Sequence, residues 1–364
     1  MFRLLPLTLF IVLLFLAYLG FGQGLQKALL LLVGMGFGAT MLACRFGFTS
    51  TFRLMLLERD RFALQAHVIL LMLTTTFFAA IVFANATWFA GQGPSLAVHP
   101  VGLGVIVGAF VFGFGMQLAG TCSSGCLFTL GSGWIGAFFV AFSFMAGALL
   151  ATLHHGFWQS LVILPAFSWF GHLGEPLGLL LQLSVLFLIW RLLAPHFQRT
   201  RLNNSILWGA LILALLAAMH LIVAGKPWGV SGTFAFWGAK IALAFGIPID
   251  AWPYWSQKAL AERSFLDHPM AITNLGLILG AAIVAGIRRD PIRLPRLQES
   301  LRGTMGGFLM GYGAIIAKGC NIGAYFSGFS STSLHGWVWL PCALLGSYLC
   351  LSLINPFYAA KPAA

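Results

Sequence analysis

Residues 118–128 read LAGTCSSGCLF, a short run of small and polar residues inside a strongly apolar chain. Cys122 and Cys126 stand four residues apart, with Ser123, Ser124 and Gly125 between them. Glycine and serine favour helix ends and turns over helix interiors. The stretch therefore predicts an interrupted helix, and the sequence around it decides which kind of protein can contain one.

The composition of the chain indicates an integral membrane protein. Of its 364 residues, 60% are hydrophobic and only 8% are charged, whereas soluble domains carry about 25% charged residues. Between residues 62 and 190 the only Asp, Glu, Lys or Arg is Glu175. The alternating pattern of membrane β-barrels is absent. The expected fold class is an all-α polytopic membrane protein.

Apolar runs of about 20 residues mark candidate membrane-spanning helices. They predict about ten spans, at residues 4–20, 27–44, 64–85, 101–121, 127–151, 175–193, 205–224, 270–287, 303–319 and 334–355. We interpret the first as a span rather than a signal peptide, because no convincing small-residue cleavage site follows it. The segment 228–247 is apolar but broken by glycines, and we expect it to be re-entrant.

The basic residues account for the formal net charge of +12 and predict the orientation of the chain. They gather in three short loops, which the positive-inside rule places in the cytoplasm; these contain Arg53, Arg59 and Arg61, then Arg191, Arg199 and Arg201, then Arg288, Arg289, Arg293, Arg296 and Arg302. Loops 86–100 and 152–174 have no Lys or Arg and should face outward. Both termini are then cytoplasmic. Loop 248–268 should also be external, although it carries Lys258 and Arg263, which Asp250, Glu262 and Asp267 partly offset.

The stretch around Cys122 has a second copy 198 residues later. GAFVFGFGMQLAGTCSSGCLF (108–128) aligns without gaps to GGFLMGYGAIIAKGCNIGAYF (306–326). Glycines, phenylalanines and one cysteine coincide, and Cys122 matches Cys320. A weaker pair, GFTSTF (47–52) and GVSGTF (229–234), precedes it in the same order. The pattern predicts an internal repeat.

The loop charges predict that the two copies have opposite orientations in the membrane. Such an inverted repeat is common in secondary transporters, which place their site near the midplane where the repeats meet, but channels share the symmetry. We expect one membrane domain over 1–355, made of two five-span halves at about 1–151 and 175–355. Residues 356–364 would be a cytoplasmic tail.

The two cysteine turns carry groups suited to an anion. A helix that restarts after each turn presents unpaired N–H groups and a partly positive end. Further donors and cations lie beside them: Ser123, Ser124, Gly125, Asn321 and Gly323 in the turns, Lys318 before Cys320, and Arg45 at the end of an early span. Lys318 and Arg45 stand near predicted span ends, so an interfacial position for both side chains is the alternative.

The cysteines divide by position. Cys122 and Cys320 occupy equivalent places and are the preferred substrate-path residues, joined by Cys126, one helical turn from Cys122, and by Cys44. Cys342 and Cys350 are interpreted as packing residues. The rival uses are a soft-metal site, for which no His or carboxylate accompanies the thiols, and a persulfide-forming enzyme, for which no base is evident.

The motifs LAGTCSSG and AKGCNIGA, each after a glycine-spaced span, resemble the YeeE/YedE family of bacterial membrane proteins. The resemblance covers residues 30–355 and implies a thiosulfate uptake protein with an all-helical inverted repeat and cysteines that pass the anion along. Cys122 and Cys320 match two of the family's cysteines. The third does not match, because the family's Arg-Phe-Cys is here Arg45-Phe46-Gly47. Either Cys44 or Cys126 substitutes for it, or the substrate differs.

Together these observations predict a transporter of thiosulfate or a related small sulfur anion in a prokaryotic cytoplasmic membrane. They call for no cofactor, no metal and no nucleic acid. Passive movement, ion coupling and hand-over to a soluble sulfur-carrier protein on the cytoplasmic side are all compatible with the sequence.

Overall fold

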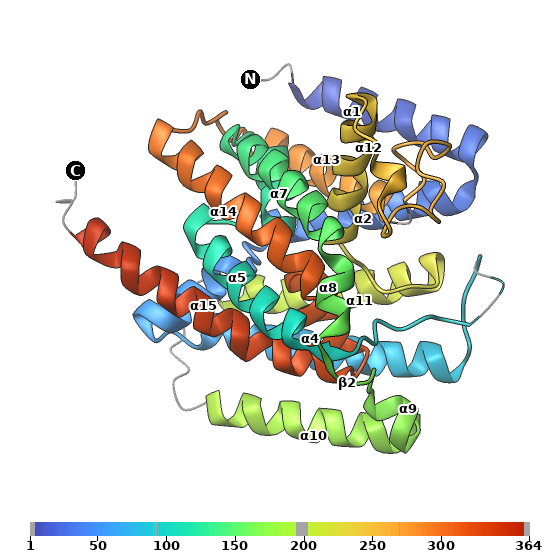
Figure 1. Cartoon of the computed structure of the whole chain (residues 1–364), viewed down its shortest axis with the longest axis vertical. Helices are drawn as coiled ribbons and strands as arrows, with labels where there is room; N and C mark the ends of the chain where they lie inside the picture. Colours follow the sequence, from blue (N-terminus) through green and yellow to red (C-terminus); the bar gives the residue numbers. More distant parts are fainter. Residues whose placement is uncertain (1–3, 90, 92, 194–202, 269, 360–364) are drawn as a thin grey trace.

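A computed structural model describes residues 4–89, 91, 93–193, 203–268 and 270–359 as a bundle of helices (Figure 1). The longer helices are α1 (Leu4–Ala17), α2 (Leu25–Ala43), α4 (Phe62–Phe83), α5 (Leu103–Ala119), α7 (Gly136–Leu153), α10 (Glu175–Leu193), α11 (Asn203–Ala224), α12 (Ser231–Ala244), α13 (Ala271–Arg288), α14 (Leu297–Ile316) and α15 (Leu334–Ala359). The shorter elements are α3 (Phe48–Arg53), α6 (Ser123–Gly131), α8 (His155–Ser160), α9 (Trp169–Leu173), strands β1 (Val101–Gly102) and β2 (Val162–Leu164), π-helical η1 (Tyr18–Gln23), η2 (Leu54–Glu58) and η5 (Asn321–Gly328), and the 3₁₀ turn η4 (Ile249–Ala251).

Within the described residues, eight helical stretches are long and apolar enough to cross a membrane. This confirms the expected all-α polytopic membrane protein. The predicted span 4–20 is α1 with the start of η1, and the predicted span 303–319 is α14, which begins earlier, at Leu297. The predicted span 127–151 is divided, because α6 ends at Gly131 and α7 begins at Gly136. The predicted re-entrant segment contains α12, whose 14 residues are too few to cross a bilayer.

Helices α5 and α14 pack at the centre of the bundle through reciprocal glycines. A Cβ added at Gly108 would lie 2.6 Å from the carbonyl oxygen of Gly313, and one at Gly313 would lie 2.5 Å from that of Gly108. Gly115 and Gly306 approach in the same way, at 2.6 and 2.5 Å. Under the offset of 198, Gly108 is the counterpart of Gly306 and Gly115 that of Gly313. Exchanging the two halves therefore turns the Gly108–Gly313 contact into the Gly306–Gly115 contact. This is the signature of two-fold symmetry.

The surrounding helices repeat this relation. Helix α7 packs on α14 as α15 packs on α5, and α2 packs on α13 as α4 packs on α11. Gly147 of α7 lies against the backbone of Phe308, and Gly346 of α15 against that of Phe110. Small residues let helices approach closely where lipid removes the hydrophobic drive for association. This packing supports the internal repeat, while the opposite membrane orientation of its halves stays a prediction.

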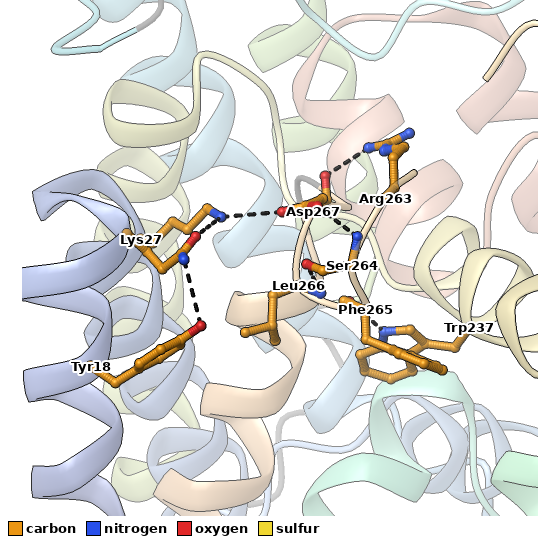
Figure 2. Close-up of polar contacts among 9 residues, drawn as sticks. Tyr18, Lys27, Trp237, Arg263, Ser264, Phe265, Leu266 and Asp267 are labelled. Carbon is orange, nitrogen blue, oxygen red and sulfur yellow. Dashed lines mark hydrogen bonds and ion pairs between the residues drawn. The ribbon is translucent and has the colours of Figure 1, made fainter. Parts of the chain in front are cut away.

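Segments predicted to share a side of the membrane meet at one end of the bundle. At the end predicted to face outward, Ala97 N–H donates to Ser331 Oγ, and β1 pairs with β2. Loop 252–268 joins the same end, where Asp267 pairs with Lys27 at the start of α2 (Figure 2). At the other end, Arg53 Nε donates to Gln117 Oε1, and the backbones of Trp134 and Arg293 form an isolated β-bridge. The predicted external position of loop 248–268 is therefore consistent with its neighbours.

Candidate functional site

The two cysteine turns have the same backbone conformation. Helix α5 is followed by Gly120 at φ 72°, and α14 by its counterpart Lys318 at φ 60°. Cys122 (φ −106°, ψ −176°) and Cys320 (φ −98°, ψ −165°) are both extended, and each is the N-cap of the helix that follows. The prediction that both helices are interrupted at these turns is confirmed. The sequence repeat is thus a repeat of local structure as well.

The Cys122 thiol acts as the cap of α6. Its Sγ accepts the Gly125 N–H at 3.3 Å and lies 3.5 Å from Ser124 Oγ. Uncapped N–H groups give a helix N-terminus a partial positive charge. Cys122 therefore lies at a helix end whose remaining unpaired N–H groups suit a bound anion.

Polar side chains beside both turns are buried without partners. In the described chain, Ser123 Oγ and both polar atoms of Asn321 make no hydrogen bond, although both residues are fully buried. Ser123 and Asn321 are counterparts in the repeat. Thr49 Oγ1 lies beside the Cys122 thiol, also without a well-formed hydrogen bond. Each unsatisfied buried polar group costs about 1–3 kcal/mol, so their clustering at equivalent positions indicates a place for a polar ligand.

Three cysteines lie close together at this level. Cys122, Cys126 and Cys320 are buried and near enough to interact electrostatically. All three are free thiols. Cys126 Sγ donates to the Ser123 carbonyl at 3.1 Å, so its hydrogen bond is used within its own helix. In the described residues, no three His, Cys, Asp or Glu side chains are arranged to hold a metal ion.

A cavity of about 830 Å³ leads from the Arg-rich end of the bundle to Cys122 and Gly125. Its wall includes Gly47, Phe48, Thr49 and Ser50, which precede or begin α3. Its charged lining residues are Arg53, Arg293, Arg296 and Arg302, against Asp290 and Glu299, which is four positive charges less two negative, or +2. We call it the inner vestibule, after the side on which the loop charges place it. A positively lined cleft concentrates anions.

A second group of cations lies beyond the other turn. Lys318 Nζ is 3.5 Å from His155 Nε2, and Lys258 Nζ sits 3.3 Å from the centre of the Tyr254 ring, which packs on His155. Within the described chain, neither lysine has a carboxylate within ion-pair distance. Burial, then the charges of Lys318 and Lys258, lower the pKa of His155 to about 4. Burial, then the charges of Arg263 and Lys318, lower the pKa of Lys258 to about 8. Uncompensated cations of this kind favour a bound anion.

Loop 252–268, which carries Lys258, makes several polar contacts around Asp267 (Figure 2). Asp267 Oδ1 lies 3.4 Å from Lys27 Nζ, its Oδ2 accepts the Ser264 N–H, and its carbonyl accepts from Arg263 Nη2. The Ser264 N–H and the nearby Lys27 hold the pKa of Asp267 below its usual value. Trp237 of α12 also donates to the Phe265 carbonyl. The loop is thereby tied to α2 and α12.

The other predicted site residues are placed differently. Gly125 lines the inner vestibule, and Gly323 is partly exposed, with open space where a Cβ would stand. Ser124 is buried beside Cys122. Cys44 and Arg45 are not among the residues that line the inner vestibule. Cys44 faces α11 instead, where a Cβ at Gly209 would lie 3.5 Å from its Sγ.

Gly47, where the family resemblance leads us to expect a third cysteine, does line the inner vestibule. A Cβ there would lie 2.6 Å from Ser50 Oγ, which donates to the Gly47 carbonyl. The hydroxyl of Ser50 therefore occupies the space beside Gly47. Neither Cys44 nor Cys126 takes that place in the vestibule wall.

Sequence reasoning missed several residues of both cation groups. Thr49, Ser50 and Gln117 line the inner vestibule, and its arginines were interpreted only as markers of orientation. His155, which the sequence analysis did not select, contacts Lys318. Lys258 looked like an exception to the loop charges. The signal was available, since Lys258 and Arg263 lie in a loop predicted to be external, where basic residues are unusual.

Comparisons with known proteins agree with the architecture. The model of a family described as Sulphur transport matches residues 43–349. The thiosulfate transporter TsuA of Spirochaeta thermophila is 28% identical over 350 residues, which cover 87% of this chain and 96% of that protein. TsuA of Escherichia coli (strain K12) is 27% identical over 348 residues, with coverage of 87% and 91%. A probable transporter YedE of Salmonella typhimurium is 31% identical over 160 residues, 42% of this chain and 39% of YedE.

Proposed function

The chain belongs to the sulphur-transport family of membrane transporters, and we propose that its substrate is thiosulfate or a closely related small sulfur anion. The observation that carries this proposal is the pair of equivalent cysteine turns with unpartnered polar side chains. Ser123 and Asn321 offer buried hydrogen-bonding atoms beside Cys122 and Cys320. The substrate named for the TsuA relatives has chemistry that suits this set.

Thiosulfate has a terminal sulfur at one end and oxygens at the other, and the turns provide partners for both. A thiol is a weak hydrogen-bond donor and a soft contact for the terminal sulfur. The hydroxyl of Ser123, the amide of Asn321 and the helix N-termini suit the oxygens. Lys318 and Lys258 on one side, and the inner vestibule on the other, favour the approach of an anion from either end.

The loop charges support an orientation, and the bacterial relatives support a setting. We place the protein in a prokaryotic cytoplasmic membrane with both termini in the cytoplasm, so that the inner vestibule opens inward. Its volume of about 830 Å³ is much larger than one small anion. A folded protein is far larger than this cavity, so a soluble sulfur-carrier protein would receive the anion at the cytoplasmic mouth of the vestibule.

The first prediction tests the cysteine turns. Cys122→Ser and Cys320→Ser should each reduce uptake of labelled thiosulfate at least tenfold, because a hydroxyl is a harder, smaller partner for the terminal sulfur. The assay uses a bacterial strain that cannot assimilate sulfate and has this protein as its only thiosulfate route. Growth on thiosulfate provides a second readout.

Cys342→Ser is the matched control, since Cys342 is a free, partly exposed thiol of α15 outside both turns, and it should retain uptake. Absence of uptake by the wild-type protein, when it is present in the membrane, would reject the substrate assignment. Unchanged uptake by both turn variants would reject the role of the thiols. A stable persulfide on Cys122 during turnover, detected by mass spectrometry, would instead favour a sulfur-transfer enzyme.

A further inference from the structure

Two buried histidines inside membrane-spanning helices differ in how their ring nitrogens are used. His220 in α11 has a partner for each: Nδ1 lies 3.0 Å from the Lys226 carbonyl oxygen and Nε2 lies 3.2 Å from Thr273 Oγ1. His67 in α4 is equally buried, but within the described chain its Nδ1 has no partner. A ring whose two nitrogens are both hydrogen-bonded has a structural role, whereas a ring with an unpartnered nitrogen can still form a hydrogen bond or bind a proton.

The hydrogen bonds around His67 determine which of its ring nitrogens carries the proton and which has a free lone pair. Thr51 Oγ1 donates its proton to the Gly47 carbonyl at 2.7 Å. Its contact with His67 Nε2, at 3.3 Å, therefore has the hydroxyl as acceptor and Nε2–H as donor. In the neutral ring, Nδ1 then carries a lone pair. His67 presents a vacant, buried proton acceptor.

The surroundings of His67 join the two halves of the protein. Its ring stacks on Phe46 at 4.7 Å and packs against Phe48 at 4.8 Å and Tyr325 at 6.2 Å. Phe48 lines the inner vestibule, and Tyr325 lies in η5, which begins directly after Cys320. Tyr325 is the titratable group that faces the ring. From α3, η5, α10 and α11, no charged side chain of the described residues acts on it.

A threonine–histidine contact also occurs in the second half of the repeat. Thr51 corresponds to Thr233 in the weaker motif pair, and Thr233 Oγ1 also contacts a histidine, His268, at 3.0 Å. It accepts a further hydrogen bond from Asn274 Nδ2 at 3.0 Å, and Met270 N–H donates to the same His268 nitrogen. Within the described chain, the His268 nitrogen beside Thr233 thus has a second partner, whereas Nδ1 of His67 has none.

We propose that His67 binds a proton that crosses the membrane together with the anion. This inference rests on the proposed function and adds the coupling of anion transport to a proton. An anion at the cysteine turns brings negative charge into a region of low dielectric, where it favours a positive charge nearby. The vacant Nδ1 of His67 accepts a proton there, held in place through Thr51 and Gly47. When the anion leaves, the uncompensated imidazolium is unfavourable and releases its proton.

The test measures both ions in the same vesicles. The full-length protein is reconstituted into proteoliposomes with a trapped pH-sensitive dye, and labelled thiosulfate is added outside. Wild-type protein should acidify the lumen in step with entry of the label. His67→Gln should admit the label with at least a fivefold smaller acidification per anion. His220→Gln, the matched control, should keep the wild-type ratio.

The outcomes separate this inference from the proposed function. Absence of label entry in the wild type would overturn the substrate assignment and the coupling with it. Label entry without acidification in the wild type, or an unchanged proton yield per anion in His67→Gln, would overturn the coupling alone. Should His67→Gln fail to fold, the wild-type ratio still decides, and Thr51→Val should also lower the proton yield because it removes the oxygen that holds the ring.

Discussion

At the scale of single residues, Lys318 is the position where stability and function oppose each other. It has a left-handed backbone, φ 60°, which disfavours every residue with a Cβ, whereas its counterpart in the other half is Gly120. Its side chain reaches His155 and is only partly exposed. Because a lysine stands where the other half of the repeat has glycine, and its side chain reaches His155, we expect its ammonium group to have a function.

Replacing that lysine should therefore separate the two properties. Lys318→Gly should raise the free energy of unfolding by about 1 kcal/mol, because it removes the left-handed strain, yet raise the KM for thiosulfate severalfold, because a cation is lost near the second turn. Thermal unfolding in detergent and labelled uptake measure the two effects.

Arg59→Gly is the control for this pair of measurements. Arg59 also has a left-handed backbone, φ 55°, and lies in a loop outside the inner vestibule. This variant should gain similar stability without a change in KM. If Lys318→Gly had the wild-type KM, a role of the ammonium group in anion capture would be rejected.

At the scale of elements, the contact between α5 and α14 determines where both turns lie. The glycines let the two backbones touch, and each helix then ends beside the centre of the bundle, where its cysteine turn follows. Only residues without a Cβ permit this approach, because the added carbon at Gly108 or Gly313 would meet a carbonyl oxygen at 2.6 or 2.5 Å. The same spacing that identifies the repeat in the sequence therefore also forms the contact.

The two-fold relation predicts matched effects at counterpart contacts. Gly108→Ala and Gly313→Ala each insert a Cβ against the other helix and should lower the free energy of unfolding by about 1–3 kcal/mol, the usual cost of overpacking. Thermal unfolding of the purified protein is the measurement. Gly156→Ala in α8, which has nothing within 4 Å of the added Cβ, should be neutral. A loss in only one of the two would contradict the reciprocal contact.

At the scale of the whole molecule, cations are separated into two groups with the buried thiols between them. The inner vestibule gathers residues from α3, α5, α6 and the loop before α14. The other group combines Lys318, His155 and Lys258, from three segments far apart in the chain. Loop 252–268 completes this second group because Asp267 and Phe265 fasten it to α2 and α12.

The pKa of Lys258 predicts how uptake responds to pH. Lys258 is charged below its pKa of about 8 and neutral above it, so its attraction for an anion is lost as the external pH rises through about 8. Uptake should then fall, with KM rising more than the maximal rate falls. Lys258→Arg should keep a low KM at alkaline pH, because guanidinium stays protonated.

Lys226→Arg, which changes a lysine outside this group, should keep the wild-type pH profile. Identical pH profiles for Lys258→Arg and the wild type would contradict the role of Lys258. The KM readout also distinguishes this effect from the proton yield per anion that tests His67.

The sequence by itself determined the class, the repeat and the chemistry of the turns. The apolar composition leaves only a membrane as solvent, and the aligned cysteines and glycines identify two copies of one interrupted helix. These properties are local, since they depend on residue type and spacing along the chain. For the same reason, the helix breaks before Cys122 and Cys320 were predictable from glycine, serine and asparagine.

Only the tertiary structure decided which side chains accompany the cysteines. Lys258 joins Lys318 through a loop fastened by Asp267, Cys44 turns to α11, and Ser50 fills the space beside Gly47. The vacant nitrogen of His67 depends on a hydroxyl and three aromatic rings from other segments. Spacing along the chain cannot predict these arrangements, because each depends on how distant helices pack and on which hydrogen bonds that packing leaves unmade.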